Sequence, residues 1–404
     1  MTIFKEIPPT AGFPLRLKDI LFALAETNRK GLLEEDFRHY LKIPYARATY
    51  SGTAAFYSIL ESLKGLSAKK TIVIPAFICP LVALAIAKAG LKVKICDIDK
   101  DSFDYDYGCL ENLYRNDPDI LAVVAAHLGG IPVDLERITK TAQANNVFVI
   151  EDCAQSLGAE YKNLKIGTYG DFAFFSLCRG KGLTIYEGGI AVTKNEEYAQ
   201  LLNNTINCLE DNRFFSEALK ILELFGYWIF YRPALFWFVF RLPQIYWKHR
   251  KDMVRAAGDY FDADIPLHRV SAFRKSLGHV TFNRLDGEIS KQRDKAACYI
   301  TKLKNIPGLK IITEPAEAKA TYPFITLIFD DPVRRQQALK KLERSGMGGS
   351  IIYLRAITDY EYLKNFIPNS ACPNAKNLAN RHLTLSTSTF LDKKSIETII
   401  NLGF

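Results

Sequence analysis

An apolar strand that ends in two carboxylates limits what this chain can fold into more than any other feature. The stretch from Val147 to Val192 reads VFVIEDCAQSLGAEYKNLKIGTYGDFAFFSLCRGKGLTIYEGGIAV, and its first apolar residues run directly into Glu151 and Asp152. A buried strand has no structural need for these charges, and ligands of open α/β sheets bind outside the carboxyl ends of the strands. We therefore expect Asp152 to lie beside a ligand.

Lys181 is the second unusual residue of this stretch. Gly180 and Gly182 flank it, and the sequence beside it is apolar. We expect its amine to be partly removed from water, which makes a lysine a better nucleophile toward carbonyls. Pyridoxal phosphate (PLP) chemistry requires such a pair, because a lysine holds the aldehyde as a Schiff base and a carboxylate keeps the pyridine nitrogen protonated. Taken alone, the two residues are more typical of an exposed loop lysine and a helix-capping aspartate.

The sequence around these residues closely resembles the central signature of the DegT/StrS family of PLP-dependent aminotransferases, most of which aminate keto sugars attached to nucleotides. Further segments resemble the family, in the family's order: ATYSGTAAFYSIL, VIPAFICPLVALAIAKAGLKVKICDID, AAHLGGIPVDLERI and PNAKNLANRHLTLSTSTFLDKKSIETII. The resemblance implies the type I fold of PLP-dependent transferases. This is an α/β fold with a mostly parallel central sheet in a large domain and a smaller α/β C-terminal domain.

The resemblance also implies a role for individual residues around PLP. Lys181 is the catalytic residue and bonds to the aldehyde, Asp152 contacts the pyridine nitrogen, and Gln155 contacts the phenolic oxygen. The phosphate is held by four residues, which are Gly52, Thr53, Ala54 and Ser176. A small-residue turn at a helix start suits a phosphate, because free N–H groups and the positive end of the helix dipole lie there.

Two further positions around the cofactor are less clear. His127 follows the apolar run 120–126, and its family counterpart lines the cofactor pocket, although a histidine at a strand end is usually a hydrogen-bonded core residue. At the position of Cys79, many family members have an aromatic ring that stacks on the pyridine. Cysteine cannot stack, so either Phe77 replaces the ring or the cofactor face is covered in another way.

Alternating apolar and helical patterns predict the domain organisation. We expect an N-terminal arm over 1–48, a large PLP-binding domain over 49–287 and a small C-terminal domain over 288–404. Helices are expected at 17–28, 34–41, 52–63, 80–88, 134–144 and 333–345, and strands at 71–74, 91–98, 120–126, 309–312 and 322–329.

The composition excludes several classes of protein. The 404 residues, 48% of them hydrophobic, suffice for two packed domains. The eight cysteines are scattered without a CxxC pair, so we expect no metal site and no disulfide framework. The first residues contain charges and prolines where a secretory signal is apolar, which favours the cytoplasm. The net charge of +9 comes without a nucleic-acid-binding motif, so we expect no nucleic-acid partner.

The family resemblance fails from about 204 to 264, and we place an aromatic-rich insert at about 212–262. It contains all three tryptophans, Trp228, Trp237 and Trp247, and the basic run KHRK follows at 248–251. Prolines interrupt the apolar sequence of the insert, so each uninterrupted apolar run is too short to cross a bilayer, which takes about 20 residues. Three interpretations stay open. The tryptophans and the segment 224–251 could contact a membrane surface, the insert could form a dimer contact, or it could extend the core.

The segment PLHRVSAFRKSLGH resembles the family segment that carries an asparagine and an arginine. Arg269 matches the arginine and is a candidate substrate contact. Leu267 replaces the asparagine, which in the family reaches across the dimer to the neighbouring cofactor phosphate.

The resemblance leads us to expect a homodimeric aminotransferase that moves an amino group, from glutamate, to the keto group of a nucleotide-linked sugar. The insert and Leu267 favour an alternative acceptor, a lipid or lipid-linked carbonyl compound at the inner face of the membrane. A second alternative is a non-catalytic regulator with a PLP fold, against which the intact Asp152, Gln155, Ser176 and Lys181 argue.

Overall fold

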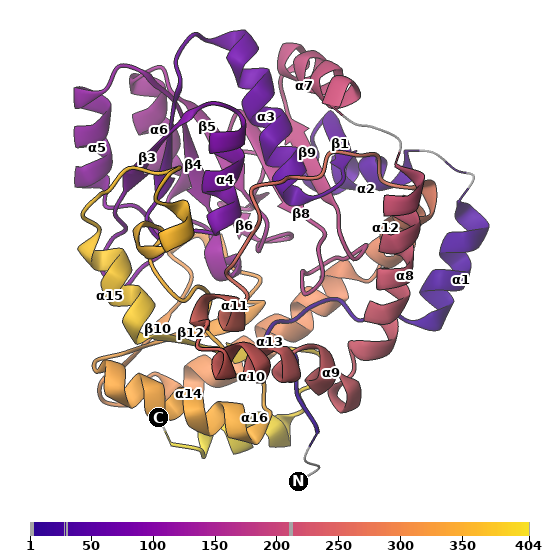
Figure 1. Cartoon of the computed structure of the whole chain (residues 1–404), viewed down its shortest axis with the longest axis vertical. Helices are drawn as coiled ribbons and strands as arrows, with labels where there is room; N and C mark the ends of the chain where they lie inside the picture. Colours follow the sequence, from indigo (N-terminus) through magenta and orange to yellow (C-terminus); the bar gives the residue numbers. More distant parts are fainter. Residues whose placement is uncertain (1–3, 28, 30, 210–212, 404) are drawn as a thin grey trace.

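A seven-stranded sheet forms the centre of the computed structural model, which describes residues 4–27, 29, 31–209 and 213–403 (Figure 1). The strand order is β1-β9-β8-β5-β4-β2-β3, and β9 runs antiparallel to both of its neighbours. The pairs β2/β3, β2/β4, β4/β5 and β5/β8 are parallel, so the predicted mostly parallel sheet is confirmed. The strands are β1 Tyr45–Thr49, β2 Thr71–Pro75, β3 Lys92–Cys96, β4 Ile120–Ala126, β5 Phe148–Asp152, β8 Phe172–Ser176 and β9 Gly189–Thr193.

Helices cover both faces of this sheet, and each face has its own apolar core. Successive strand residues point to opposite faces, so Ile72 and Ile74 of β2 join one buried cluster and Val73 joins the other. The helices are α3 Gly52–Leu66, α4 Pro80–Lys88, α5 Tyr107–Asn116, α6 Leu135–Ala144, α7 Glu196–Leu209 and α12 Ala272–Phe282, with a 3-10 turn η1 at Leu128–Gly130. The predicted elements of this region are confirmed, with ends that shift by a few residues.

The N-terminal arm forms two helices, α1 Leu17–Glu26 and α2 Leu32–Leu41, and then enters the central sheet as β1. The first helix was expected to reach Asn28, which lies outside the described residues. Gly31 precedes α2 with a φ of 77°, a left-handed conformation that glycine adopts without strain.

The C-terminal part contains an antiparallel sheet in the order β10-β12-β13, formed by Leu309–Ile312, Phe324–Phe329 and His382–Ser386. The helices α13 Leu285–Leu303, α14 Pro332–Ser345, α15 Pro373–Arg381 and α16 Lys393–Ile400 pack around it, with 3-10 turns η2 Ile357–Asp359 and η3 Glu361–Leu363. A short sheet β11-β6-β7 (Ala318–Lys319, Glu160–Tyr161, Leu164–Lys165) joins this part to the central one. The predicted domain boundary at 287/288 falls inside α13, and the division into domains stays a prediction.

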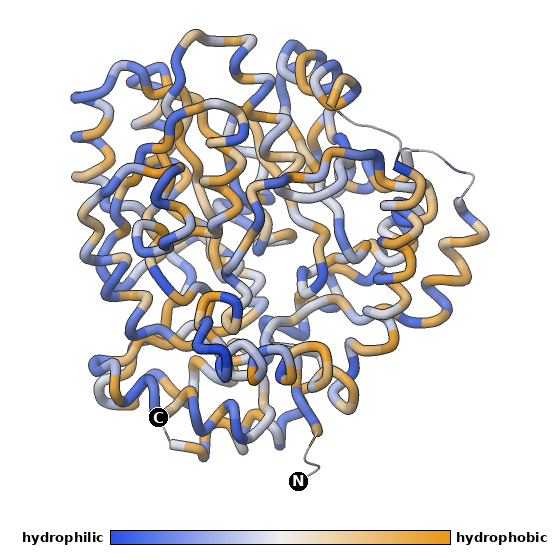
Figure 2. The backbone as a smooth tube through the Cα atoms, in the orientation of Figure 1, coloured by the Kyte–Doolittle hydropathy of each residue, from blue (hydrophilic) through white to orange (hydrophobic). Residues whose placement is uncertain are grey.

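The insert forms α8 Phe214–Phe230, α9 Pro233–Val239, α10 Arg241–His249 and α11 Met253–Ala257; its predicted first residue lies outside the described residues. These helices run from the central part to the front of α14 (Figure 1). The tube along α8 and α9 carries long hydrophobic stretches (Figure 2). Within the described ranges, no helix has the length and apolarity that crossing a membrane requires.

Candidate active site

The start of α3 forms a turn that is open to an anion. Ser51 caps the helix, since its Oγ accepts a hydrogen bond from the Ala54 N–H at 3.0 Å. Gly52 lies so close to the end of β8 that a Cβ on it would be 2.9 Å from the Cβ of Ser176. The first N–H groups of a helix have no partner within the helix. Three of the predicted phosphate residues therefore start one helix, and the fourth, Ser176, lies against them.

Asp152 lies at the carboxyl end of β5 and is 6% exposed. One oxygen accepts a hydrogen bond from the Ala154 N–H at 3.0 Å. Burial raises the pKa of its carboxyl group, while the Ala154 N–H and the charge of Lys181 oppose this rise. A buried carboxylate of this kind is stabilised by a cation, and a protonated pyridine nitrogen supplies one. The site thus fits PLP, with Asp152 and Lys181 close enough to interact electrostatically.

Lys181 lies on the turn after β8, where the arm holds it in place. The Phe13 N–H donates to the Lys181 carbonyl at 3.0 Å, and the Thr10 hydroxyl donates to the Gly180 carbonyl at 3.0 Å. Gly180 needs to be glycine, since its φ is 78°. A Cβ at Gly182 would meet nothing within 4 Å, so the space on this side of Lys181 is open. That openness leaves the Lys181 side chain partly exposed.

Gln155 is oriented by hydrogen bonds at both ends of its amide. Its oxygen accepts from the Gly129 N–H at 2.9 Å, and its nitrogen donates to the Tyr353 hydroxyl at 3.3 Å. The amide nitrogen has a second hydrogen, which can donate to the phenolic oxygen of PLP. No motif pointed to Tyr353, because it comes from a loop of the C-terminal part, 198 residues further along the chain than Gln155.

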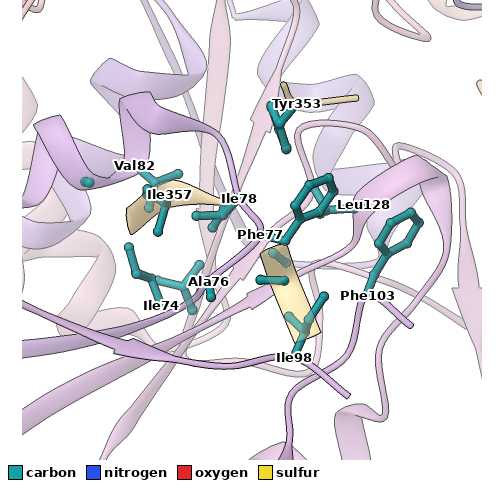
Figure 3. Close-up of a cluster of buried hydrophobic side chains, with 14 of the residues drawn as sticks. Ile74, Ala76, Phe77, Ile78, Val82, Ile98, Phe103, Leu128, Tyr353 and Ile357 are labelled. Carbon is teal, nitrogen blue, oxygen red and sulfur yellow. The ribbon is translucent and has the colours of Figure 1, made fainter. Parts of the chain in front are cut away.

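Phe77 does not replace the missing aromatic ring at Cys79. Its ring is fully buried, stacks 6.2 Å from the Phe103 ring and meets the Tyr353 ring edge-on (Figure 3). The His382 ring also meets it edge-on. Cys79 itself is partly exposed, and burial raises the pKa of its thiol to about 12. The Cys79 thiol also interacts electrostatically with Lys181 and Asp152, which places it in the site as a neutral group.

Asp259 is a further residue of this region that the sequence reasoning missed. One carboxylate oxygen accepts hydrogen bonds from the Leu354 N–H and the Tyr360 hydroxyl, both at 2.6 Å. Burial raises the pKa of this carboxyl to about 6, and its charge acts on the Cys79 thiol. Asp259 lies in the insert, where the family resemblance ends, so no motif pointed to it.

His127 is buried, and both of its ring nitrogens have protein partners. One nitrogen accepts from the Val133 N–H at 3.2 Å, and the other lies 3.3 Å from a Glu151 oxygen. The ring can therefore offer PLP a face but no free hydrogen bond. His127, Glu151 and Cys153 lie close enough together to hold a metal ion. The Glu151 oxygens, however, already accept the N–H groups of residues 167, 169 and 170, so we regard the cluster as structural.

The remaining predicted contacts are Arg269 and the three tryptophans. Arg269 is exposed. The three tryptophans are partly buried; Trp237 packs 4.9 Å from the Phe4 ring, and the guanidinium of Arg255 lies 4.9 Å from the Trp247 ring. The exposed apolar residues of the insert helices are instead Phe214, Phe215, Leu219, Leu222, Ile229, Phe230, Phe238, Val239, Leu242, Ile245, Tyr246 and Met253.

The fold is that of the type I PLP-dependent transferases. Solved structures with this fold include PseC of Helicobacter pylori, an aminotransferase involved in pseudaminic acid biosynthesis by its description, with a TM-score of 0.77, 18% identity and coverage of 98% of both chains. The model of the DegT/DnrJ/EryC1/StrS aminotransferase family matches residues 23–223 and 266–402. The chain belongs to this family of PLP-dependent aminotransferases, and the break in the match coincides with the insert.

Two relatives illustrate the range of similarity. The spore coat polysaccharide biosynthesis protein SpsC of Bacillus subtilis is 25% identical over 96% of this chain and 94% of its own length. The GDP-perosamine synthase of Escherichia coli O157:H7 is 32% identical over 40% of this chain and 44% of its own length.

Proposed function

We propose that this aminotransferase moves an amino group from glutamate to the keto group of a nucleotide-linked sugar. The observation that carries the proposal is the placement of the buried Asp152 carboxylate within electrostatic reach of Lys181. The similarity to a GDP-perosamine synthase supports a sugar nucleotide as the acceptor. The name of that relative refers to a GDP-linked sugar, and the full-length relative SpsC is named for polysaccharide biosynthesis.

Each site residue has a defined task in this proposal. PLP, when bound, draws electrons from the substrate carbon. Asp152 keeps a proton on the pyridine nitrogen, and the Gln155 amide donates to the phenolic oxygen. The Lys181 amine would hold the cofactor through its aldehyde, and as a free amine it would move a proton at the substrate carbon. Gly52, Thr53, Ala54 and Ser176 hold the phosphate, which neutralises the positive end of the α3 dipole.

The proposal includes a homodimer, in which Arg269 serves the partner's site. Its exposure on one chain supports this arrangement. Leu267 is partly buried and has no polar group for a partner's phosphate, so the phosphate contact across the dimer is reduced compared with the family pattern. Sedimentation analysis tests the dimer. Complementation of an Arg269→Ala chain by a Lys181→Ala chain in mixed dimers then tests whether the arginine acts across it.

The proposal also includes contact of the segment 224–251 with the cytoplasmic face of a membrane. Apolar side chains are exposed along α8, α9 and α10, and the basic run 248–251 follows them. Arg250 and Lys251 can meet anionic lipid. Co-sedimentation with anionic liposomes tests this contact, and protein that stays in the supernatant at low salt refutes it.

The visible absorption of the purified, PLP-loaded protein tests the reaction. Excess glutamate is expected to bleach the cofactor band. After glutamate removal, a nucleotide-linked keto sugar is expected to restore the band, which shows the second half of the transfer. Recovery with a detergent-dispersed lipid extract, and not with the sugar nucleotide, overturns the proposed acceptor. A protein that shows no cofactor band after PLP is added overturns the role of Lys181.

A further inference from the structure

A cavity of about 500 Å³ lies between the insert and the N-terminal arm, next to the turn that carries Lys181. This volume falls within the ~300–1,000 Å³ of ordinary ligand sites. Its lining residues are Pro8, Pro9, Thr10, Arg179, Gly180, Tyr186, Glu223, Gly226, Tyr227, Phe230, Tyr231, Phe236, Val239 and Phe240. Eight of these come from α8, α9 and the residues beside them, so the insert builds most of the wall.

The wall of the cavity offers ring faces rather than hydrogen bonds. Tyr227 and Tyr231 stack with ring centroids 4.5 Å apart, and Phe236 meets Tyr231 edge-on at 5.5 Å. Both tyrosine hydroxyls are already used, because Tyr227 donates to the Phe13 carbonyl at 2.9 Å and Tyr231 donates to the Thr10 carbonyl at 3.3 Å. The faces of these rings therefore give the cavity an apolar wall, which suits a hydrocarbon chain because such a chain needs no hydrogen-bond partner.

The cavity opens onto the apolar surface of the insert. Phe230 and Val239 line the cavity and are also 37% and 49% exposed. Their exposed neighbours on the same helices are Ile229 and Phe238. A chain can therefore pass from this surface into the cavity without crossing a polar rim.

One cation lies in the lining of the cavity. Arg179 is exposed, and no carboxylate of the described ranges forms an ion pair with it. The lining carboxylate, Glu223, is already paired with Lys220 at 2.9 Å. Lys220 also pairs with Glu187 at 2.8 Å, and both glutamates act on the charge of Arg179, so the charges of these four groups balance. Arg179 is the exposed cation among them, and its guanidinium can pair with an anionic head group.

We propose that this cavity binds the hydrocarbon chain of an anionic membrane lipid, with the lipid head group paired to Arg179. The site gives the proposed membrane contact a specific anchor. The bound chain would also pack against Thr10 and Gly180, which adjoin Lys181. This inference rests on the proposed function in one respect, which is that the proposed membrane contact supplies the lipid.

Direct binding to the purified full-length protein tests this site without any need for turnover. The probe is cis-parinaric acid, whose fluorescence rises in an apolar site, and the wild-type protein is expected to bind it. Gly226→Leu fills the cavity from within, since a Cβ at this helical position meets nothing within 4 Å. We expect this variant to bind the probe about tenfold more weakly or worse. The matched control is Gly287→Leu in α13, where the space is equally open but no cavity lies; it should bind like wild type.

The head-group contact has its own test. Arg179→Gln is expected to weaken binding of the fatty acid by about tenfold and to leave binding of the matching alcohol unchanged. No binding by the wild type, or unchanged binding by Gly226→Leu, overturns the proposal. If Gly226→Leu changes the oligomeric state and leaves probe binding unchanged, the cavity is instead a contact site for a second copy of the chain. If a sugar nucleotide competes with the probe, the cavity belongs to the acceptor site, and the proposed lipid site is overturned. Failure of aminotransfer with intact probe binding refutes only the proposed function.

Discussion

Removing Arg241 is expected to detach the insert from the N-terminal arm. Two nitrogens of its guanidinium bond both oxygens of Glu6, each at 2.9 Å, and the two residues are 7% and 1% exposed. Arg241→Met keeps the length of the side chain and removes the charge, which leaves the Glu6 carboxylate buried without its partner. Breaking a buried pair in this way costs about 3–5 kcal/mol. We expect a loss of this size in the free energy of unfolding of the insert.

Lys248→Met is the matched control, because Lys248 lies on the same helix and pairs with Glu343 at 2.8 Å. Its side chain is 37% exposed, so its loss should cost at most about 1 kcal/mol. Denaturant unfolding at pH 7, followed by fluorescence, measures both variants, since Trp237 and Trp247 lie on α9 and α10 and report on the insert directly. Equal stability of the two variants refutes the reasoning that the buried pair holds the insert.

The same pair predicts how the Arg241→Met defect depends on pH. Burial raises the native-state pKa of Glu6 above the ordinary glutamate value of 4.5, and Arg241 opposes that rise. In the variant the opposition is lost and the native-state pKa rises further. A carboxyl whose pKa is raised by folding adds stability below its unfolded pKa and loses this contribution as the pH rises through the native value. The defect should therefore shrink as the pH is lowered from 7 toward 4.5, and a constant defect contradicts this account.

Two further predictions concern the site. Gly180→Ala forces a side chain into the left-handed region at φ 78°, so it should lower the free energy of unfolding by about 1–2 kcal/mol and weaken PLP retention. Gly182→Ala should leave stability and PLP retention near wild type. Thermal unfolding and the cofactor band measure the two properties, and equal effects of the two variants contradict the prediction. Asp259→Asn removes a buried carboxyl whose pKa is raised from 3.8 to about 6. Wild type should lose stability relative to this variant as the pH rises from 4 to 7, by about 3 kcal/mol at most, because each pKa unit is worth about 1.4 kcal/mol. Unfolding curves at several pH values test this, and parallel pH profiles refute it.

Local patterns predicted the central sheet well. The seven residues of β4 are all buried, and an apolar run of this length has no other place in an α/β fold. Asp152 at the end of β5 and Gly52 at the start of α3 were recognisable for the same reason. Their position at an element end follows from the residues beside them, and the parallel order of the strands then brings the two ends together.

Contacts across long stretches of chain were not predictable. Tyr353 reaches Gln155 only because the C-terminal part packs over the central sheet, and Phe77 turned out to be core because Phe103 and Tyr353 surround it. Within the insert, composition indicated an unusual surface but not which side chains form it. The tryptophans turn toward the protein, and phenylalanines and leucines of α8 face outward.

Mapping the lysine that bonds to PLP tests the central claim most directly. The PLP-loaded protein is reduced with borohydride, digested and analysed by mass spectrometry, with Lys181→Ala as the control. The account predicts that the pyridoxyl group is found on the peptide that contains Lys181, and that the control variant has neither the modified peptide nor the visible band. A pyridoxyl group on another lysine, with Lys181 unmodified and the protein active, would contradict it.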